Sequence, residues 1–300
     1  MDSWLTTVGL PIALAIVMLG LGLGLSIADF RRIATYPLLM LIALACQVIL
    51  LPAICFGLVL AFDLAPELAV GMMLLAASPG GTTANLYSHL FGGHVAVNVT
   101  LTAVNSVLAV VTLPVVVNLS TDYFQPDSQA VGLQVDKVLQ VFAIVLVPVA
   151  LGMAIRSRFP GFADRLGTPV KILSAVVLVA VITGAILKER ANLADYFIAV
   201  GAVVLVFNLI SLAIGYGAPR LAGMGKPESI AAGMEIGIHN STLAIAIAVS
   251  PALLDNTRIA VPAAVYGIVM FFTAAAFGYL VTRQKEAADG TRVTPRQLST

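Results

Sequence analysis

The sequence predicts an all-α polytopic membrane protein with nine transmembrane helices. Hydrophobic residues make up 60% of the 300-residue chain and charged residues only 10%, whereas soluble domains contain about 45–50% apolar and about 25% charged residues. The apolar stretches are long and unbroken rather than alternating, which indicates helices and not the strands of a β-barrel. This composition excludes a soluble domain, a disordered chain and a secreted disulfide scaffold. The two cysteines, Cys46 and Cys55, lie in one apolar run and imply no disulfide framework or zinc site.

Stretches without Asp, Glu, Lys or Arg define the spans. One charge-free stretch, residues 68–121, is too long for a single crossing and divides at Phe91–His94. The first span has no basic segment before it and is longer than a signal-peptide core, so we expect a retained helix. The predicted spans are residues 3–28, 33–62, 67–90, 95–118, 138–155, 170–187, 193–217, 228–249 and 259–282.

The basic residues predict the orientation of the chain. If the N-terminus lies outside, 12 of the 16 Lys and Arg residues face the cytoplasm and 4 face the outside, as the positive-inside rule requires. The four outside are Lys137, Lys188, Arg190 and Arg258. We therefore expect a multi-pass protein of the inner (plasma) membrane with its N-terminus outside and its C-terminus in the cytoplasm.

Two of the spans are interrupted by polar residues. The third carries Ser78-Pro79-Gly80-Gly81-Thr82-Thr83-Ala84-Asn85 at its middle, where proline removes a backbone donor and glycine adds conformational freedom. The eighth carries Glu235, His239 and Asn240 within residues 233–242. Ionisable groups at this depth cost a few kcal/mol each and are functional by default. The sequence therefore predicts broken helices near 78–85 and 233–242.

The positions of the two breaks predict an inverted repeat. Each break falls in the fourth member of a five-span unit if the first unit lacks its first span, and paired interruptions of this kind are typical of secondary transporters. The expected organisation is a first repeat at 1–118, an extracytoplasmic connection at 119–134, a second repeat at 135–282 and a cytoplasmic tail at 283–300. Each break exposes carbonyls that suit a cation and a half-helix N-terminus that suits an anion.

These motifs resemble those of the bile acid:sodium symporter family. The resemblance rests on Pro79-Gly80-Gly81-Thr82-Thr83-Ala84-Asn85 followed by Asn98 and Thr102, on Glu235-Ile236-Gly237-Ile238-His239-Asn240-Ser241, and on Gln47 five residues before Pro52. It covers nearly the whole chain and is specific for the family but not for the substrate. It implies a bacterial homologue in the nine-span form, with the two broken helices crossing in a core domain beside a panel domain.

The resemblance also implies sodium ligands, which are oxygen donors that suit a hard cation. One site would use Asn85, Asn98, Thr102 and Glu235, and a second would use Gln47, Glu235, Ile236, Ile238 and His239. Two residues depart from the family pattern. Ala84 stands where the family commonly has Ser, and His239 stands where it has Gln. The second site is therefore weakened, lost or replaced by a proton site.

The resemblance places the substrate at the same breaks. Thr82, Thr83, Asn240 and Ser241, with their neighbouring backbone amides, would bind an organic anion, either a small carboxylate or a bile-acid-like molecule. The last span adds only Tyr266 and Thr273. The expected partners are this small anion and the lipid bilayer, with no nucleic acid and no second subunit.

The leading hypothesis is sodium-coupled uptake of an organic anion by alternating access, and the alternative is a proton-coupled carrier of the same fold that uses Glu235 and His239. A structural reading remains open, in which Glu235 pairs with His239 four residues on. We do not expect an enzyme, because no metalloprotease-like His/Glu spacing or pair of intramembrane aspartates occurs. The chain also lacks a channel filter repeat and the P-loop of a pump.

Overall fold

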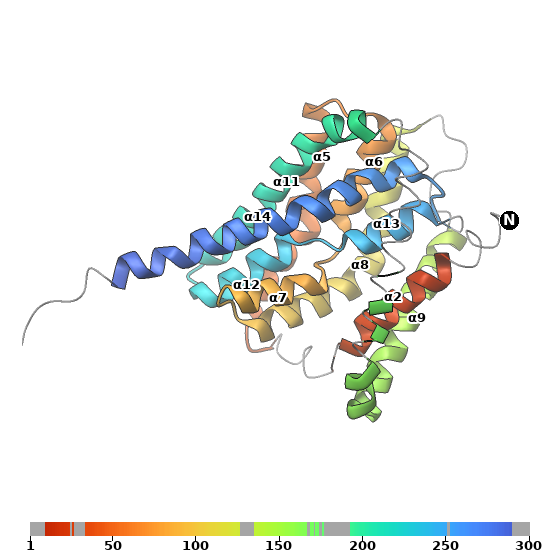
Figure 1. The fold of residues 1–300 in the computed structure, drawn as a ribbon. Coiled ribbons are helices and arrows are strands. Elements are labelled where there is room, and N and C mark those ends of the chain that lie inside the picture. The colour runs from red at the N-terminus through yellow and green to blue at the C-terminus, as the bar shows by residue number, and fades with distance from the viewer. Residues whose placement is uncertain are drawn as a thin grey trace, which may run out of the picture.

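The computed structural model describes residues 10–24, 26, 34–126, 135–166, 169–170, 172–173, 176, 193–250 and 253–289. Within these residues every regular element is a helix, as the sequence predicts. Figure 1 shows their arrangement. The helices are α2 (Leu10–Gly24), α4 (Pro37–Ala45), η3 (Cys46–Leu50), α5 (Leu51–Ala61), α6 (Pro66–Ala77), α7 (Thr82–Leu90), α8 (Val95–Phe124), α9 (Val135–Arg158), α11 (Leu193–Leu221), α12 (Lys226–Gly237), α13 (Ser241–Val249) and α14 (Thr257–Asp289).

Four stretches of helix are long and apolar enough to cross a membrane, counting only the described residues. They are Pro37–Ala61, Val95–Phe124, Phe197–Leu221 and Thr257–Arg283. The predicted span at 170–187 lies almost entirely outside the described residues, so the count of nine spans stays a prediction. The part of the chain that the structure describes is therefore all-helical, as expected of a membrane protein with this composition.

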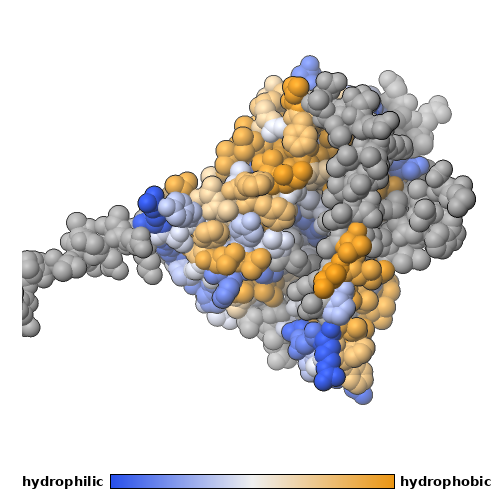
Figure 2. Space-filling view, in the orientation of Figure 1, coloured by the Kyte–Doolittle hydropathy of each residue, from blue (hydrophilic) through white to orange (hydrophobic). Residues whose placement is uncertain are grey.

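The surface of the helices is apolar where a bilayer would cover it. Large hydrophobic side chains such as Ile198, Leu221 and Phe272 are 79%, 92% and 73% exposed. Figure 2 shows hydrophobic residues over much of the visible face, with hydrophilic residues gathered toward the far ends of α9 and α14. Such a band is expected of helices in contact with lipid tails.

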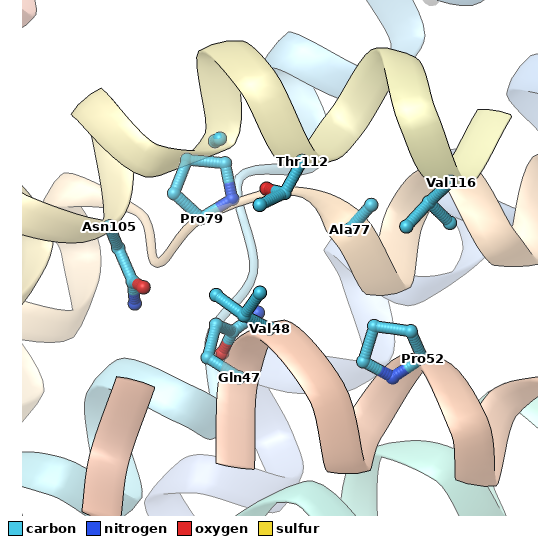
Figure 3. Close-up of a pocket in the computed structure, with 9 residues that line it drawn as sticks. Gln47, Val48, Pro52, Ala77, Pro79, Asn105, Thr112 and Val116 are labelled. Carbon is cyan, nitrogen blue, oxygen red and sulfur yellow. The ribbon is translucent and has the colours of Figure 1, made fainter. Parts of the chain in front are cut away.

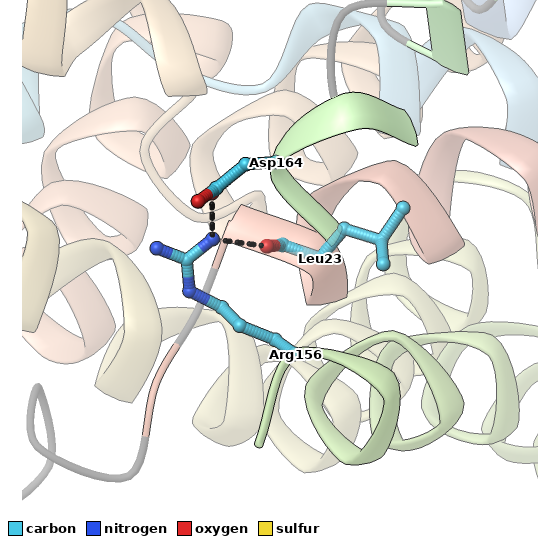
Figure 4. A network of polar contacts seen from close by, with 3 residues as sticks. All are labelled: Leu23, Arg156 and Asp164. Atoms are coloured by element: carbon cyan, nitrogen blue, oxygen red, sulfur yellow. Dashed lines mark hydrogen bonds and ion pairs between the residues drawn. The ribbon is translucent and has the colours of Figure 1, made fainter. Parts of the chain in front are cut away.

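Helices α2 and α9 pack side by side, with smaller contacts to α8 and α13 (Figure 1). Small residues allow this close approach. A Cβ atom at Gly152 of α9 would come within 2.6 Å of the backbone of Leu19 and Leu23 in α2. At one end of this pair, Arg156 donates to the Leu23 carbonyl at 2.9 Å and to Asp164 at 3.2 Å (Figure 4). The arginine thus supplies a positive charge at the C-terminus of α2, where it is electrostatically favourable.

The remaining described helices form two similar sets. Each set has a long first helix, a helix broken into segments of 12 and 9 residues, and a long last helix. The broken helices are α6–α7 and α12–α13, and both begin with a Pro-Glu pair in the first turn. Proline is favoured at that position and an acidic residue interacts well with the helix N-terminus.

Helix α6 ends because proline follows it. Ser78 is extended, with φ −70° and ψ 140°, since a residue before proline is disfavoured in the α conformation. Pro79 has no N–H to continue the ladder. The unwound segment covers only residues 78–81, and Thr82–Asn85 are helical, so the break is shorter than the predicted 78–85.

Helix α12 ends without a proline. Residues 233–237 are still helical, and the break covers only residues 238–240 of the predicted 233–242. Asn240 caps the next helix, accepting a hydrogen bond from the Leu243 N–H at 3.0 Å. A local side-chain cap of this kind competes with continuation of the preceding helix.

Two other helices extend past their predicted ends. Helix α8 continues to Phe124, into the segment expected to be a connection, and the Ser120 hydroxyl bonds back to the Val116 carbonyl at 2.6 Å within it. Helix α14 continues to Asp289, into the expected tail. Polar residues at a membrane surface can extend a helix beyond the apolar core, and hydropathy does not detect that extension.

The close packing of α2 on α9 predicts a destabilising substitution. Gly152→Leu places a large side chain against the backbone of α2, and overpacking of this kind costs about 1–3 kcal/mol. We expect a lower unfolding temperature in detergent by fluorescence-detected thermal unfolding. Gly57→Leu is the matched control, because a Cβ at Gly57 meets nothing within 4 Å. Equal unfolding temperatures for the two variants would show that α2 and α9 do not pack this closely.

Candidate functional site

The two breaks cross and bond each other through their backbones. The Gly81 N–H donates to the Ile238 carbonyl at 2.8 Å, and the Asn240 N–H donates to the Pro79 carbonyl at 2.8 Å. Gly80 and His239 form the antiparallel bridge between them. Backbone groups freed from one helix are therefore satisfied by the other, as the bilayer interior requires.

Glu235 lies beneath this crossing with no exposed surface. Its Oε2 accepts a hydrogen bond from the Thr102 hydroxyl at 2.5 Å. The Asn105 side chain and the backbone of Gly80 lie close to the carboxylate. The contact with Gly80 is so close that a Cβ atom there would collide with the carboxyl group, which explains the glycine.

Three side-chain oxygens on α7, α8 and α12 are buried and have no hydrogen-bond partner. They are Oε1 of Glu235, Oδ1 of Asn98 and Oδ1 of Asn85. Asn98 uses its amide nitrogen, which donates to the Ala231 carbonyl at 2.6 Å and leaves the oxygen free. Helices α7, α8 and α12, which carry these residues, pack against one another. Unpaired buried oxygens are costly and call for a ligand that accepts their lone pairs.

A second polar cluster joins Gln47, Ser78 and His239. The Ser78 carbonyl lies 3.1 Å from Gln47 Nε2 and 3.1 Å from His239 Nδ1. Because a carbonyl only accepts, both nitrogens donate to it, and His239 carries its proton on Nδ1. The imidazole stacks on Phe207 at 5.5 Å and lies edge-on to Tyr266 at 5.3 Å. The sequence predicts Gln47 and His239 as cation ligands. In the structure, both side chains instead direct N–H groups to the Ser78 carbonyl.

Gln47 reaches the crossing from a π-helical turn. Cys46–Leu50 forms the π-helix η3 in the middle of a continuous span, just before Pro52. Proline cannot donate to the helical ladder, and a π-turn accommodates the resulting mismatch. Such turns are frequent at functional sites. The sequence indicates Gln47 but gives no sign of the π-turn.

The Gly237 carbonyl, at the end of α12, is satisfied by neighbouring helices. Asn208 of α11 donates to it at 2.8 Å and Tyr266 of α14 donates to it at 2.9 Å. Thr273 in turn donates to the Asn208 oxygen. Tyr266 and Thr273 are the two polar groups that the sequence offers for a substrate pocket on the last span. In the structure, their hydroxyls instead bond the groups that stabilise the second break. Asn208 is the interhelical contact that an intramembrane asparagine usually makes.

The residues predicted to bind the anion lie at two helix N-termini. Helix α7 begins at Thr82 and Thr83, and helix α13 begins at Ser241 after the cap Asn240. The first amides of a helix have no carbonyl partner within it and carry a partial positive charge. Ser241 Oγ is buried and has no partner. The crossing brings both N-termini to one place, which suits an anion.

The structure separates the two ionisable residues of the second break. Glu235 bonds Thr102 of α8, whereas His239 bonds Ser78 of the first break. Helix α12 ends between them at Gly237, so they do not form the four-residue helical pair of the structural reading. Sequence reasoning missed Asn105, because an intramembrane asparagine in a long helix carries no local signal that distinguishes a ligand from a packing contact.

Comparison with known proteins identifies the family. Residues 11–196, more than half of the chain, match the model of the Sodium Bile acid symporter family. The chain belongs to this family. It is 27% identical to an uncharacterized sodium-dependent transporter, YocS, of Bacillus subtilis (strain 168), over 89% of this chain and 80% of that protein.

Two eukaryotic relatives have similar identity. The human ileal sodium/bile acid cotransporter is 26% identical over 78% of this chain and 67% of its own length. A probable chloroplastic sodium/metabolite cotransporter, BASS2, of Oryza sativa subsp. japonica is 26% identical over 90% of this chain and 63% of its own length. Members of the sodium symporter family are transporters and not enzymes, so the chain is a membrane transport protein of the sodium symporter type.

The hydrogen bond from Thr102 to Glu235 predicts a stability difference. Thr102→Val keeps the shape but removes the donor, and a hydrogen bond to a charged group contributes about 1.5–3 kcal/mol. We expect a lower unfolding temperature in K⁺ buffer. Thr100→Val is the control, because Thr100 is also buried in α8 and bonds only the Ala96 carbonyl of its own helix. If both variants unfold at the same temperature, Thr102 does not hold the carboxylate.

Proposed function

We propose that this protein couples inward movement of Na⁺ to uptake of a small organic anion. One observation carries the proposal. The fully buried carboxylate of Glu235 lies against the crossing of two broken helices, and buried oxygens of Glu235, Asn98 and Asn85, on three helices that pack against one another, lack hydrogen-bond partners. A cation bound among them would satisfy these oxygens and neutralise the buried charge.

The chemistry of this cluster favours sodium. Its ligands would be the carboxylate of Glu235, the amide oxygens of Asn85 and Asn98, and the hydroxyl of Thr102, and hard cations prefer such oxygens. Ala84, which is buried at the same helix start, contributes no oxygen. The relatives named above are described as sodium-dependent transporters and sodium cotransporters, which supports the choice of ion.

We infer one sodium ion rather than two. The second predicted set is Gln47, Glu235, Ile236, Ile238 and His239. The carbonyl of Ile238 already accepts from Gly81, and Gln47 and His239 direct N–H groups to Ser78. Glu235 is engaged by Thr102. The imidazole thus holds the two breaks together in the way that a second cation between them would.

The anion would bind at the paired N-termini of α7 and α13. Thr82, Thr83, Asn240 and Ser241 supply amides and hydroxyls there, next to the proposed sodium, whose charge would add to the attraction. Tyr266 bonds the Gly237 carbonyl and Thr273 bonds Asn208, so neither adds a free polar group to the pocket. A small carboxylate or a bile-acid-like molecule fits this chemistry.

The transport mechanism we propose is alternating access. In this proposal the chain has nine spans in an inverted repeat, α2 and α9 belong to a panel domain, and the two crossing helices form the core domain. Sodium orders the crossing, the anion binds beside it, and the core moves against the panel. The protein would act as a monomer in the inner membrane, with its N-terminus outside.

Proton coupling is the alternative, and it would use Glu235 and His239. His239 Nε2 is buried without a partner, which leaves one nitrogen free to take a proton. Transport driven by a pH gradient and indifferent to Na⁺ would establish this alternative. Uptake that requires Na⁺ at constant pH would exclude it.

The sodium proposal predicts a loss of ion-induced stabilisation in Glu235→Gln. A ligand that binds only the folded state at 100 times its Kd stabilises that state by about 2.7 kcal/mol. We expect Na⁺, but not K⁺, to raise the unfolding temperature of the wild-type protein, and neither ion to raise that of the variant. The measurement is thermal unfolding of purified protein over a range of Na⁺ concentrations.

Glu228→Gln serves as the matched control, because Glu228 lies in the first turn of the same helix and is partly exposed. It should respond to Na⁺ like the wild type. Full Na⁺ stabilisation of Glu235→Gln would remove this carboxylate from the ion site.

The single-ion proposal predicts a gain of function in His239→Gln. A glutamine adds an amide oxygen where the imidazole offers none, so a second cation can bind. We expect the Na⁺ dependence of uptake or of thermal stability to steepen from a Hill coefficient of about one to about two. His89→Gln, at an exposed histidine of α7, should leave the coefficient unchanged. A wild-type coefficient near two would contradict the proposal.

A further inference from the structure

The last helix, α14, bonds a segment of each broken helix. The Tyr87 hydroxyl of α7 donates to the Phe271 carbonyl of α14 at 3.1 Å. The Tyr266 hydroxyl of α14 donates to the Gly237 carbonyl, at the end of α12, at 2.9 Å. One unbroken helix is therefore linked both to the segment that follows the first break and to the segment that precedes the second.

The contact with α7 runs along one face of α14. The Tyr87 ring stacks on Phe271, with 6.3 Å between the ring centroids. Phe91, directly after α7, packs so closely on Gly278 that a Cβ atom there would collide with its ring. Phe271 and Gly278 are seven residues apart, which places them on the same side of a helix. The end of α7 is thus held to α14 over two helical turns.

The contact with α12 uses another face of α14. Tyr266 and Thr273 are also seven residues apart. Tyr266 bonds the Gly237 carbonyl directly, and Thr273 bonds the oxygen of Asn208. The amide nitrogen of Asn208 donates to the same carbonyl at 2.8 Å. At 3.6 residues per turn, this face is turned by roughly 140° from the face that contacts α7.

The first break is enclosed differently on the side that precedes α7. There, η3 and α5 lie across from the end of α6 and from α8 (Figure 3), through residues Gln47, Val48, Pro52, Ala77, Pro79, Asn105 and Thr112. Helix α7 itself lies against α8, α12 and α14. The position of α7 relative to α12 therefore depends in part on the helix that both of them contact, α14.

Both points of attachment lie two residues from a proposed sodium ligand. Tyr87 follows Asn85 on α7, and Gly237 follows Glu235 on α12. Asn85 and Glu235 each have a buried oxygen without a hydrogen-bond partner. One cation can bind both oxygens only if the two helices are correctly placed. Ligands that are held in place before binding lose less free energy when the ion orders them.

We propose that α14 is a brace that sets the affinity of the sodium site, with the hydroxyls of Tyr87 and Tyr266 as positioning residues. Tyr87 fixes α7 against α14, and Tyr266 fixes the end of α12 against α14. Neither hydroxyl is a ligand of the ion in this proposal. The inference rests on the proposed sodium site at Glu235 and adds two residues that act on it from outside.

Two conservative substitutions test the brace. Tyr87→Phe and Tyr266→Phe each remove one hydroxyl and keep the ring. The unfolding temperature of the purified protein is measured over a range of Na⁺ concentrations, with K⁺ added to keep the ionic strength constant. The concentration dependence of the stabilisation gives the Kd for Na⁺. We expect each variant to raise this Kd roughly fivefold, the change produced when the loss of one ordinary hydrogen bond acts on ion binding.

Tyr279→Phe is the matched control for both variants. Tyr279 also lies on α14, but it is 51% exposed and its ring lies under Arg283. Its Kd for Na⁺ should equal that of the wild type. Should Tyr266→Phe fail to fold, Thr273→Val takes its place, because it removes the bond to Asn208 one step further from Gly237. Its control is Thr282→Val, since the Thr282 hydroxyl bonds the Gly278 carbonyl of its own helix.

The Kd distinguishes positioning from a purely structural role. A contact that only stabilises the fold lowers the unfolding temperature in K⁺ and leaves the Kd for Na⁺ unchanged. An unchanged Kd in either tyrosine variant would therefore overturn the brace while leaving the sodium proposal intact. An equal rise of the Kd in Tyr279→Phe would also overturn it. Absence of Na⁺ stabilisation in the wild type would instead defeat the sodium proposal and the brace together.

Discussion

The membrane interior offers no water to an unpaired backbone group, and the crossing of the two breaks meets this constraint. Gly81 and Asn240 donate to carbonyls of the opposite break, each at 2.8 Å. Without these bonds, each break would leave backbone groups unsatisfied at a cost of several kcal/mol. Because neither break is tolerable alone, each requires the other. The site depends on this pairing, which places Glu235 beneath Gly80 and both half-helix N-termini at one point.

The pairing satisfies the backbone but leaves side-chain oxygens unsatisfied. The Glu235 carboxylate has Thr102 as its hydrogen-bond donor, while its second oxygen and those of Asn85 and Asn98 have none. Asn98 and Thr102 of α8 bond α12 at Ala231 and Glu235, and an ion shared among α7, α8 and α12 would add a further link. A ligand shifts a conformational equilibrium only by its difference in affinity between two states. If the ligands of an ion come from three helices, the affinity for that ion changes whenever one of these helices moves.

The sequence predicts the two breaks because proline and ionisable residues at bilayer depth are rare and costly. It predicts their extent less well. Residues 82–85 and 233–237 are helical, since a helix re-forms as soon as its backbone permits. Gln47 is predicted, whereas the π-turn beneath it and the contact of Asn105 with Glu235 are not. Tyr266 looks like a pocket residue in the sequence and instead bonds the Gly237 carbonyl. These features depend on contacts between different helices, and the sequence of a single helix does not determine those contacts.

The two breaks are maintained by different means. At the first break, Pro79 lacks the N–H that would continue the hydrogen-bond ladder of α6. The second has no proline, and a helix could in principle run through it. Contacts from three directions keep it open: Asn208 and Tyr266 bond the Gly237 carbonyl, His239 bonds Ser78, and Asn240 caps α13. Asn208 lies on α11 and Tyr266 on α14, so any shift of those helices acts on the end of α12 two residues from Glu235. The second break therefore depends on side-chain contacts from α11 and α14 rather than on a proline.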